Sequence, residues 1–338
     1  MIEITDSIDK KKWDEFVFNH PQGNIFQTSD MAEVYRLTKN YEPISLAAVD
    51  NESGEILALI QSVVIREMSG LIGSFSARSI IQGGPLYINN DEGFKAASSL
   101  VDHYEHIIHG KAIYTQIRNT HDDSKIKKVF EKAGYLYEGH LNYQIKLDRD
   151  ENEIWKDIHN SRRRGINRAM KNGIEILTIS NENEILPFYN ILKETYQNVS
   201  IPLADISLFK SAFNILAPKN MAKFYLAKND NTPTGARVVL IYKGLLFDWY
   251  AGSLKSYSNM RINETLVWYI LKMHANNDFK SFDFGGAGRP DEEYGVREFK
   301  KSFGGDLENF GRYVKTHSQS NKFVADLGFN IYKKIIKL

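Results

Sequence analysis

The sequence has 338 residues, of which 42% are hydrophobic and 25% charged, and its formal net charge is +1. This length suits two domains, and this composition is that of a globular protein and excludes global disorder. The near-neutral charge means that only a local patch could hold a nucleic acid or a membrane surface. The absence of cysteine excludes disulfides, thiolate nucleophiles and zinc sites with cysteine ligands. Because no apolar run resembles a signal sequence or a membrane span, we expect a cytoplasmic protein.

The first half of the chain alternates helix and strand signals. The segment DMAE at 30–33 has the spacing of a capping box, and apolar residues follow it on one helical face. The runs PISLAAV and EILALIQSVVIR predict two strands, which the turn signal DNESG joins. Further along we expect a helix over 91–109, the strand AIYTQIR, a helix over 123–133 and the strand LNYQIKL.

The second half repeats this order. The segment IWKDIHNSRRRGINRAMKNG predicts helices that end at Gly173, and the strand GIEILTI follows. Helices over 183–199 and 205–216 precede three strands, MAKFYLAK, ARVVLIYK and LLFDWYAGS. A helical pattern over 262–275 then leads to the strand SFDFGG and to a glycine-rich loop.

A weak internal repeat relates the two halves. VFEKAGYLYEG at 129–139 resembles EFKKSFGGDLENFG at 298–311, since each places Phe and Lys on a short helix before a glycine-marked turn. We therefore expect an α/β (α+β) protein with two similar domains, each a mostly antiparallel mixed sheet flanked by helices. The expected domains are residues 1–147 and 148–317, with a C-terminal helix over 318–338 that packs back on the first. The segment 183–217 has room only for short helices, so we expect no coiled-coil arm.

Six segments in order along the chain resemble the Fem-type peptidoglycan-bridge aminoacyltransferases. They are IFQTSDMAEVYRL, QGGPLY, SRRRGINRAMKNGIEI, WYAGS, DFGG and REFKKSFGG. The resemblance implies two GNAT-like domains, with the acyl-transfer site in the second. It also implies transfer of an amino acid from charged tRNA, the co-substrate, to an amine of a cell-wall or surface-glycan precursor, without a bound cofactor or metal.

The resemblance places Phe299 and Lys300 at the family's Phe-Lys position. There the lysine stabilises the oxyanion that forms when an amine attacks an ester carbonyl. Composition alone allows a solvated lysine pair instead. Asp283 ends a strand just before Gly285 and Gly286. It could accept a proton from the amine or orient it, or it could cap the loop through local N–H groups. The two glycines lack the dinucleotide and P-loop patterns, which favours turn geometry and close backbone approach.

The segment SRRRGINRAMKNG is a run of basic side chains with no acid between them. These are Arg162, Arg163, Arg164, Arg168 and Lys171. They could form a solvated helix face, or they could hold the phosphates of a tRNA acceptor stem or of a diphosphate. Tyr250 in WYAGS is a candidate for substrate contact, with packing as the alternative.

Two positions depart from the family's pattern. The family's precursor-binding lysine aligns near Tyr35 and Arg36, and its diphosphate-binding arginine aligns near the segment PLA at 202–204. We therefore expect an acceptor other than the standard muropeptide, with Arg36 as the candidate replacement for the lysine. The spacing of His103, His106 and His109 imitates a metal site, but without a completing carboxylate it is typical of a solvated or packed face.

Two other functions stay open. An acyl-CoA-dependent N-acyltransferase acting on an amino sugar would hold the CoA diphosphate on a glycine-rich loop at a helix N-terminus, and SYSNMRINETL at 256–266 contains no glycine. A non-catalytic RNA-binding module would retain the basic segment but could lose Lys300. We expect a monomer. The basic amphipathic end GFNIYKKIIKL would either dock on the first domain or touch anionic lipid as a peripheral membrane contact.

Overall fold

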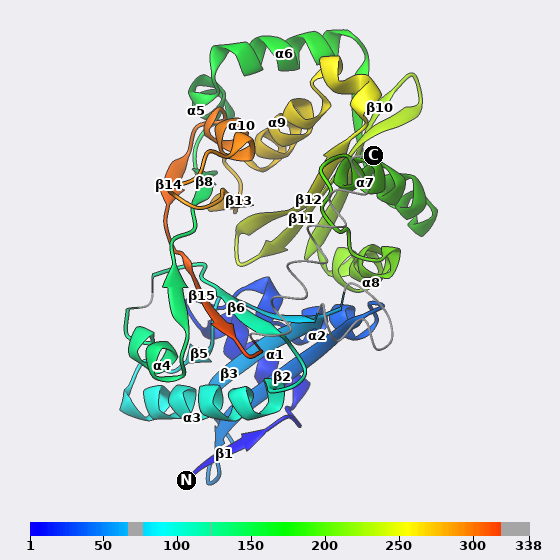
Figure 1. The fold of residues 1–338 in the computed structure, drawn as a ribbon. Helices are drawn as coiled ribbons and strands as arrows, with labels where there is room; N and C mark the ends of the chain where they lie inside the picture. Colours follow the sequence, from blue (N-terminus) through cyan, green and yellow to red (C-terminus); the bar gives the residue numbers. More distant parts are fainter. Residues whose placement is uncertain (67–76, 123, 319–338) are drawn as a thin grey trace. The chain divides into compact units, whose positions relative to one another are not determined.

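Two sheets, each in its own unit, organise the protein (Figure 1). The computed structural model describes residues 1–66, 77–122 and 124–318. Unit 1 contains residues 1–139 and the segment from Phe310 onward, and unit 2 contains residues 140–309. Both sheets are mixed and mostly antiparallel with flanking helices, which confirms the expected fold class. No helix in the described ranges is long and apolar enough to cross a membrane.

The sheet of unit 1 has the strand order β1-β2-β3-β4-β6-β15-β7, and β5 also pairs with β3. Neighbouring strands are antiparallel except for β4 and β6, which are parallel. The strands are β1 (Ile2–Thr5), β2 (Tyr41–Asp50), β3 (Ile56–Ile65), β4 (Arg78–Gln82), β5 (Leu86–Tyr87), β6 (Tyr114–Arg118), β7 (Leu136–Glu138) and β15 (Arg312–Thr316).

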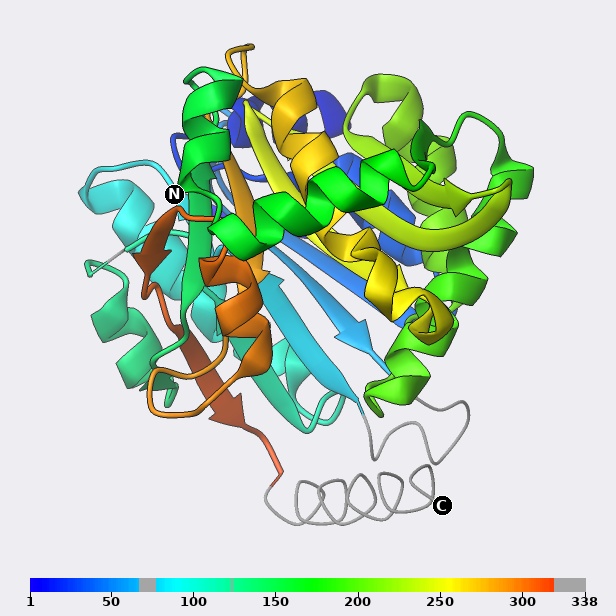
Figure 2. The same cartoon turned by 90° about the horizontal axis from the view of Figure 1, so that it is seen from above.

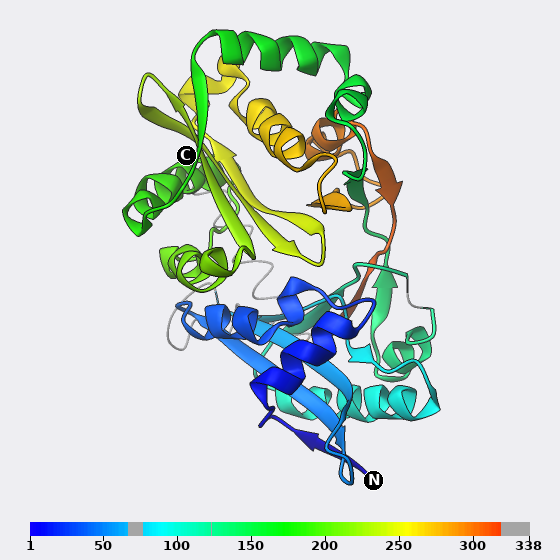
Figure 3. The same ribbon diagram turned by 180° about the vertical axis from the view of Figure 1, so that it is seen from behind.

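Helices cover both faces of this sheet. The long helix α3 (Asp91–Ile108) lies on one face, and α1 (Lys10–Asn19) and α2 (Ser29–Arg36) lie on the other (Figure 3). The side chain of Asn90 caps α3 by accepting a hydrogen bond from the Gly93 N–H at 2.8 Å, and two acidic residues follow in the first turn. The small helix α4 is Lys127–Lys132. Helix α2 does not begin with the capping box expected at 30–33, since Thr28 is its N-cap.

The sheet of unit 2 has the strand order β14-β8-β13-β12-β11-β10-β9. Only β12 and β13 are parallel neighbours. The strands are β8 (Asn142–Lys146), β9 (Ile174–Thr178), β10 (Ala222–Asn229), β11 (Thr232–Tyr242), β12 (Leu245–Ser253), β13 (Ser281–Gly286) and β14 (Asp306–Glu308).

Alternate side chains of these strands enter two apolar layers. On β10, Phe224 packs against Phe188 of α7, while its neighbour Tyr225 packs against Tyr269 of α9 on the opposite face. The first layer contains α7 (Ile185–Asn198) and α8 (Ile206–Leu216), and the second contains α9 (Ile262–His274) with α6 (Asn160–Lys171) packed on it (Figure 2). The helices α5 (Glu151–Asp157) and α10 (Gly295–Lys301) complete the unit.

Two strands lie in the sheet opposite to the one that the sequence indicated. The strand at 142–146, expected to close the first domain, pairs with β13 and β14 in unit 2. The strand at 312–316, expected in the second domain, pairs with β6 and β7 in unit 1. The chain therefore changes units near residues 139 and 309, rather than at 147 and 317. A strand's own sequence encodes its faces but not its partner, so order along the chain was a misleading guide.

Two expectations fall on residues outside the described ranges. These are the C-terminal helix over 318–338, apart from its first residue, and the lipid contact of GFNIYKKIIKL. Between 183 and 217 the structure has only short helices, so this segment contains no coiled-coil arm, as expected.

Candidate acyl-transfer site

The parallel pairing of β12 with β13 is short. Leu245, Leu246 and Phe247 pair with the strand segment 281–283, and the pairing ends there. Beyond this point β12 continues along β11 to Ser253, whereas β13 bonds to β8 on its other side. The two strands thus part in the middle of the sheet. Asp283 and Asp248 lie at this point, and both act electrostatically on Lys300.

Lys300 is buried beneath the end of β13. Its α10 helix leaves the residue only 8% exposed, while its neighbour Lys301 is exposed. The Lys300 Nζ donates to three backbone carbonyl oxygens, those of Phe284 at 2.6 Å, Gly285 at 3.2 Å and Gly286 at 2.8 Å. These bonds use all three donors of an ammonium group. Lys300 is therefore no part of a solvated lysine pair.

The charge of Lys300 is balanced by carboxylates. Burial lowers the pKa of Lys300 to about 8, and the nearby carboxylates of Asp248 and Asp283 oppose this shift. The Arg237 guanidinium lowers this pKa further. A lysine with a pKa near 8 keeps most of its charge at neutral pH, although it is buried. The arrangement can thus present a cation where the two strands part.

Asp283 is buried and fully hydrogen-bonded. Its Oδ1 accepts the Gly285 N–H at 2.6 Å, and its Oδ2 accepts Gln144 Nε2 at 3.2 Å. Asn142 Nδ2 lies 3.3 and 3.4 Å from the two oxygens. Burial raises the pKa of Asp283 to about 6, while these donors and Lys300 oppose the rise. Asp283 therefore caps the turn at Gly285, which is one of the two roles that the sequence left open.

The two glycines after Asp283 are required by different contacts. Gly285 has φ +67°, which a residue with a side chain adopts only at a cost. Gly286 has ordinary φ, but a Cβ there would lie 2.6 Å from His140 Nε2. Both glycines offer their carbonyl oxygens to Lys300. Turn geometry and close approach thus account for the pair, and no phosphate site is needed to explain them.

A buried ion pair between Arg237 and Asp248 lies beside the end of the β12–β13 pairing, and the sequence interpretation missed it. Arg237 of β11 is 2% exposed, and its Nη1 donates to Asp248 Oδ2 of β12 at 2.5 Å. Burial raises the pKa of Asp248, whereas Arg237 and Lys300 lower it. The signal was present, because a charged residue inside the strands ARVVLIYK and LLFDWYAGS must have a partner or a function.

Tyr250 lies in an aromatic cluster next to this ion pair. Its ring packs edge-on against Phe209 with centroids 4.9 Å apart, and the Tyr196 and Trp249 rings lie within 5.9 and 5.2 Å. Tyr250 is only half-buried. Packing is thus an established role of its ring, and substrate contact stays a prediction.

The basic segment folds as α6, and its members differ in environment. Arg162 donates to Glu264 Oε1 at 2.5 Å and to Ser302 Oγ at 3.0 Å, and its guanidinium lies 5.3 Å from the Phe299 ring centroid. Phe299 in turn packs on Phe303 with centroids 5.2 Å apart. Arg162 of α6 therefore contacts both α9 and the end of α10. Arg164, Arg168 and Lys171 are exposed, whereas Arg163 is half-buried and donates to Asn160 Oδ1.

Arg36 and the histidines belong to unit 1. Arg36 is exposed in the last turn of α2, where its Nε donates to Glu33 Oε2 at 2.7 Å. His103, His106 and His109 are exposed on or just after α3. Within the described residues, no group of histidine and acidic side chains has the arrangement of a metal site. Phosphate binding by Arg36 stays a prediction.

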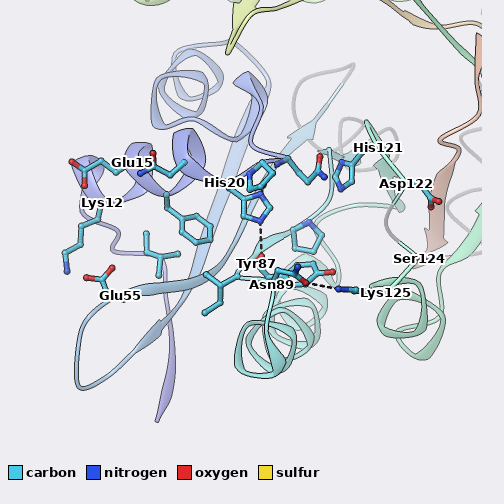
Figure 4. Close-up of a pocket in the computed structure, with 17 residues that line it drawn as sticks. Lys12, Glu15, His20, Glu55, Tyr87, Asn89, His121, Asp122, Ser124 and Lys125 are labelled. Atoms are coloured by element: carbon cyan, nitrogen blue, oxygen red, sulfur yellow. Dashed lines mark hydrogen bonds between the residues drawn. The ribbon is translucent and has the colours of Figure 1, made fainter. Parts of the chain in front are cut away.

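Unit 1 also contains a cavity of about 730 Å³ that includes none of the expected site residues (Figure 4). Its lining mixes cationic and anionic side chains, among them Lys12, Glu15, Glu55 and Lys125. His20 Nε2 faces the Tyr87 carbonyl oxygen at 2.9 Å within it. The lining favours no single class of ligand.

Comparison with known proteins identifies the architecture. Residues 157–301 match the model of the acetyltransferase (GNAT) domain. A crystal structure of FemX superposes with a TM-score of 0.67 at 16% identity, covering 96% of this chain and 99% of that chain. The chain has a tandem GNAT fold. The resemblance to the Fem-type enzymes is thus confirmed at the level of the fold, and the match to the GNAT domain model lies within unit 2.

Two further structures share this tandem GNAT fold. L-PGS from Bacillus licheniformis has a TM-score of 0.58 at 14% identity and covers 98% of this chain and 99% of its own. A tandem GNAT protein from the clavulanic acid biosynthesis pathway has a TM-score of 0.58 at 9% identity, covering 94% and 99%. A search of curated proteins finds no significant match.

Proposed function

We propose that this tandem GNAT protein transfers an aminoacyl group from charged tRNA to an amine of a cell-wall or surface-glycan precursor. The observation that carries the proposal is the buried ammonium of Lys300 at the point where β12 and β13 part. The fold shared with FemX and L-PGS supports the same class of reaction. The proposal needs no cofactor, because the ester of a charged tRNA is already activated.

Lys300 would act on the oxyanion of the tetrahedral intermediate. Attack of an amine on the ester carbonyl moves negative charge onto the carbonyl oxygen, and a cation in a buried site stabilises that charge more than it stabilises the neutral ester. The three carbonyl oxygens that hold the Nζ keep it in position before the substrate arrives. Because all three N–H groups are bound to carbonyl oxygens, Lys300 would act on the oxyanion through its positive charge and not as a free hydrogen-bond donor.

The exposed side of α6 is the part of unit 2 best suited to the donor's phosphates. Arg164, Arg168 and Lys171 are exposed and Arg163 is half-buried on this one helix of 12 residues. Arginine binds phosphate oxygens through two parallel N–H groups, and such contacts weaken as salt concentration rises. Arg162 is excluded from this role in the proposal, since Glu264 and Ser302 already bind its guanidinium.

The first turn of α9 argues against acyl-CoA as the donor. In a CoA-dependent enzyme, N–H groups at such a helix start would bind the diphosphate. Here the first turn contains the buried carboxylate of Glu264, which Arg162 and Arg261 bind at 2.5 and 3.3 Å. A diphosphate at this position would meet a negative charge whose neutralising partners are already engaged. This contact ranks acyl-CoA below charged tRNA as the donor. Acyl-CoA-dependent transfer to an amino sugar remains the second candidate because of the match to the GNAT domain model.

One experiment separates the candidates. The protein is incubated with a mixture of charged tRNAs and a mixture of acyl-CoAs, while a cell extract supplies acceptors. Protein-dependent consumption of charged tRNA supports the proposal, and consumption of an acyl-CoA supports the second candidate. Binding of tRNA without consumption of either donor would indicate a non-catalytic RNA-binding module.

A further inference from the structure

Asp248 has a buried carboxylate oxygen without a hydrogen-bond donor. The residue directly follows Phe247, the last residue of β12 that pairs with β13. Its side chain is 10% exposed, and its Oδ2 accepts Arg237 Nη1. Among the described residues its Oδ1 has no hydrogen-bond partner, and neither has the Nε of Arg237. Because a buried charged oxygen without a donor is costly, this position calls for a donor from outside the chain.

The carboxylate of Asp283 has hydrogen-bond donors for both of its oxygens. The oxygens of Asp283 accept hydrogen bonds from Gly285, Asn142 and Gln144. Both carboxylates act electrostatically on the ammonium of Lys300. Of the two, only Asp248 has a carboxylate oxygen without a hydrogen-bond donor, so the two acidic residues are expected to have different roles.

The surroundings of Asp248 restrict the chemistry of the missing donor. An anionic group such as a phosphate would be repelled by the carboxylate, whereas an amine N–H would fit it. Trp249 is the extra residue of a β-bulge, because Val239 pairs with Asp248 and Val238 with Tyr250. Bulges re-aim neighbouring side chains and are frequent beside active sites. The Asp248 Oδ1 atom thus suits an amine, and the Lys300 cation suits a developing oxyanion. One acyl-transfer reaction contains both groups.

We propose that Asp248 Oδ1 binds the amine of the acceptor and takes the proton that this amine loses during acyl transfer. The inference rests on the proposed function and adds a catalytic base to it. As the C–N bond forms, the nitrogen becomes positively charged and one of its protons passes to Oδ1. The C–O bond to the tRNA ribose then breaks, and the leaving oxygen takes a proton from Asp248. An amine and an ester become an amide and an alcohol, and the carboxylate is regenerated.

The test compares two variants in which the carboxylate is lost. In Asp248→Asn the side chain keeps its size and can still accept a hydrogen bond from Arg237, but it no longer takes a proton. We expect kcat for transfer from charged tRNA to fall at least about 100-fold, with the donor KM changed by less than roughly threefold. Thermal unfolding shows whether the variant is folded.

The double variant Arg237→Met/Asp248→Asn separates a base from a charge partner. If Asp248 served only to neutralise buried Arg237, removal of both would restore turnover. The proposal predicts that the double variant stays as slow as Asp248→Asn. The acidic limb of the pH profile of kcat should also be lost in both variants. The ionisable groups around Asp248 are Arg237 from β11, Lys300 from α10, Asp283 from β13 and Tyr196 from α7.

The outcomes distinguish this inference from the proposed function. Near-normal turnover in Asp248→Asn, or its recovery in the double variant, overturns the role of Asp248 while leaving the donor intact. If the wild-type protein consumes acyl-CoA instead, the donor is wrong, and the same variants are assayed with that thioester, because the amine loses the same proton. Absence of turnover with either donor counts against both.

Discussion

Lys300 is held in place by oxygens and kept charged by carboxylates. Three backbone carbonyl groups accept hydrogen bonds from its Nζ, and burial alone would favour the neutral amine. The family resemblance singled out Lys300, which is the buried one of two adjacent lysines, whereas composition alone does not distinguish Lys300 from Lys301. The sequence interpretation passed over Asp248 and Arg237, although a charged residue inside an otherwise apolar strand must have a partner or a function.

The depressed pKa of Lys300 predicts how activity depends on pH. In the proposed mechanism the ammonium stabilises the oxyanion, so transfer should fall as the pH rises through about 8, where Lys300 loses its proton. Lys300→Arg keeps its charge at this pH and should move the alkaline limb of kcat/KM upward, at a lower maximal rate. An unchanged alkaline limb in the arginine variant would assign this titration to another group.

The lowered pKa of Lys300 also makes the free energy of unfolding depend on pH. Above pH 8 folded Lys300 is increasingly neutral, whereas in the unfolded chain it stays protonated up to its ordinary pKa near 10.5. The unfolded state therefore binds more protons in this window, and this group's contribution to stability increases from about pH 8 to about pH 10.5. The sign is opposite to that of a lysine in a surface ion pair, whose folded-state pKa is raised.

A substitution at Gly285 tests the irregular end of β13, whose carbonyl oxygens bind Lys300. Alanine at this position must adopt φ near +67°, so we expect Gly285→Ala to lower the free energy of unfolding by about 1–2 kcal/mol. Gly295→Ala is the matched control, since a Cβ there meets no atom within 4 Å and φ is not positive. Chemical denaturation measures both variants. Equal stability of the two would mean that the turn is not strained by a side chain.

The elements show where sequence patterns are informative. The helices that periodicity predicted over 183–199, 205–216 and 262–275 agree with α7, α8 and α9. A helix that buries one face has apolar residues at regular spacing in its own sequence, so the pattern can be recognised locally. The exchange of β8 and β15 between the two sheets could not be predicted in this way. Partner choice depends on contacts between residues far apart in the chain.

The exposed part of α6 gives a prediction about the donor. Replacing Arg163 and Arg164 together by Gln should weaken binding of charged tRNA and make its dependence on salt concentration shallower, by about one unit of slope per lost phosphate contact. Lys128→Gln with Lys132→Gln is the control, because it removes the same charge from exposed positions of α4. Equal losses in the two double variants would point to net charge rather than to a binding surface.

At the scale of the whole molecule, the tandem GNAT fold does not determine the acceptor. The family's lysine and arginine for the standard precursor have no counterpart at the expected positions, and Arg36 already pairs with Glu33. We therefore predict that calorimetric titration detects tighter binding of an amino-sugar nucleotide without a peptide than of a UDP-linked muropeptide. Tight muropeptide binding that Arg36→Ala abolishes would contradict this and favour the ordinary wall-bridge acceptor.

The most direct measurement follows the chemical bond that the protein forms. Charged tRNA with a labelled amino acid is incubated with an extract that supplies acceptors, and the label that resists mild alkali is counted, because amides survive the treatment that hydrolyses the tRNA ester. We predict alkali-stable label with the wild-type protein and at least about 100-fold less with Lys300→Met, provided that the variant unfolds at a similar temperature. Equal label from the two proteins, or alkali-stable label that forms only when labelled acetyl-CoA replaces the charged tRNA, would contradict the account.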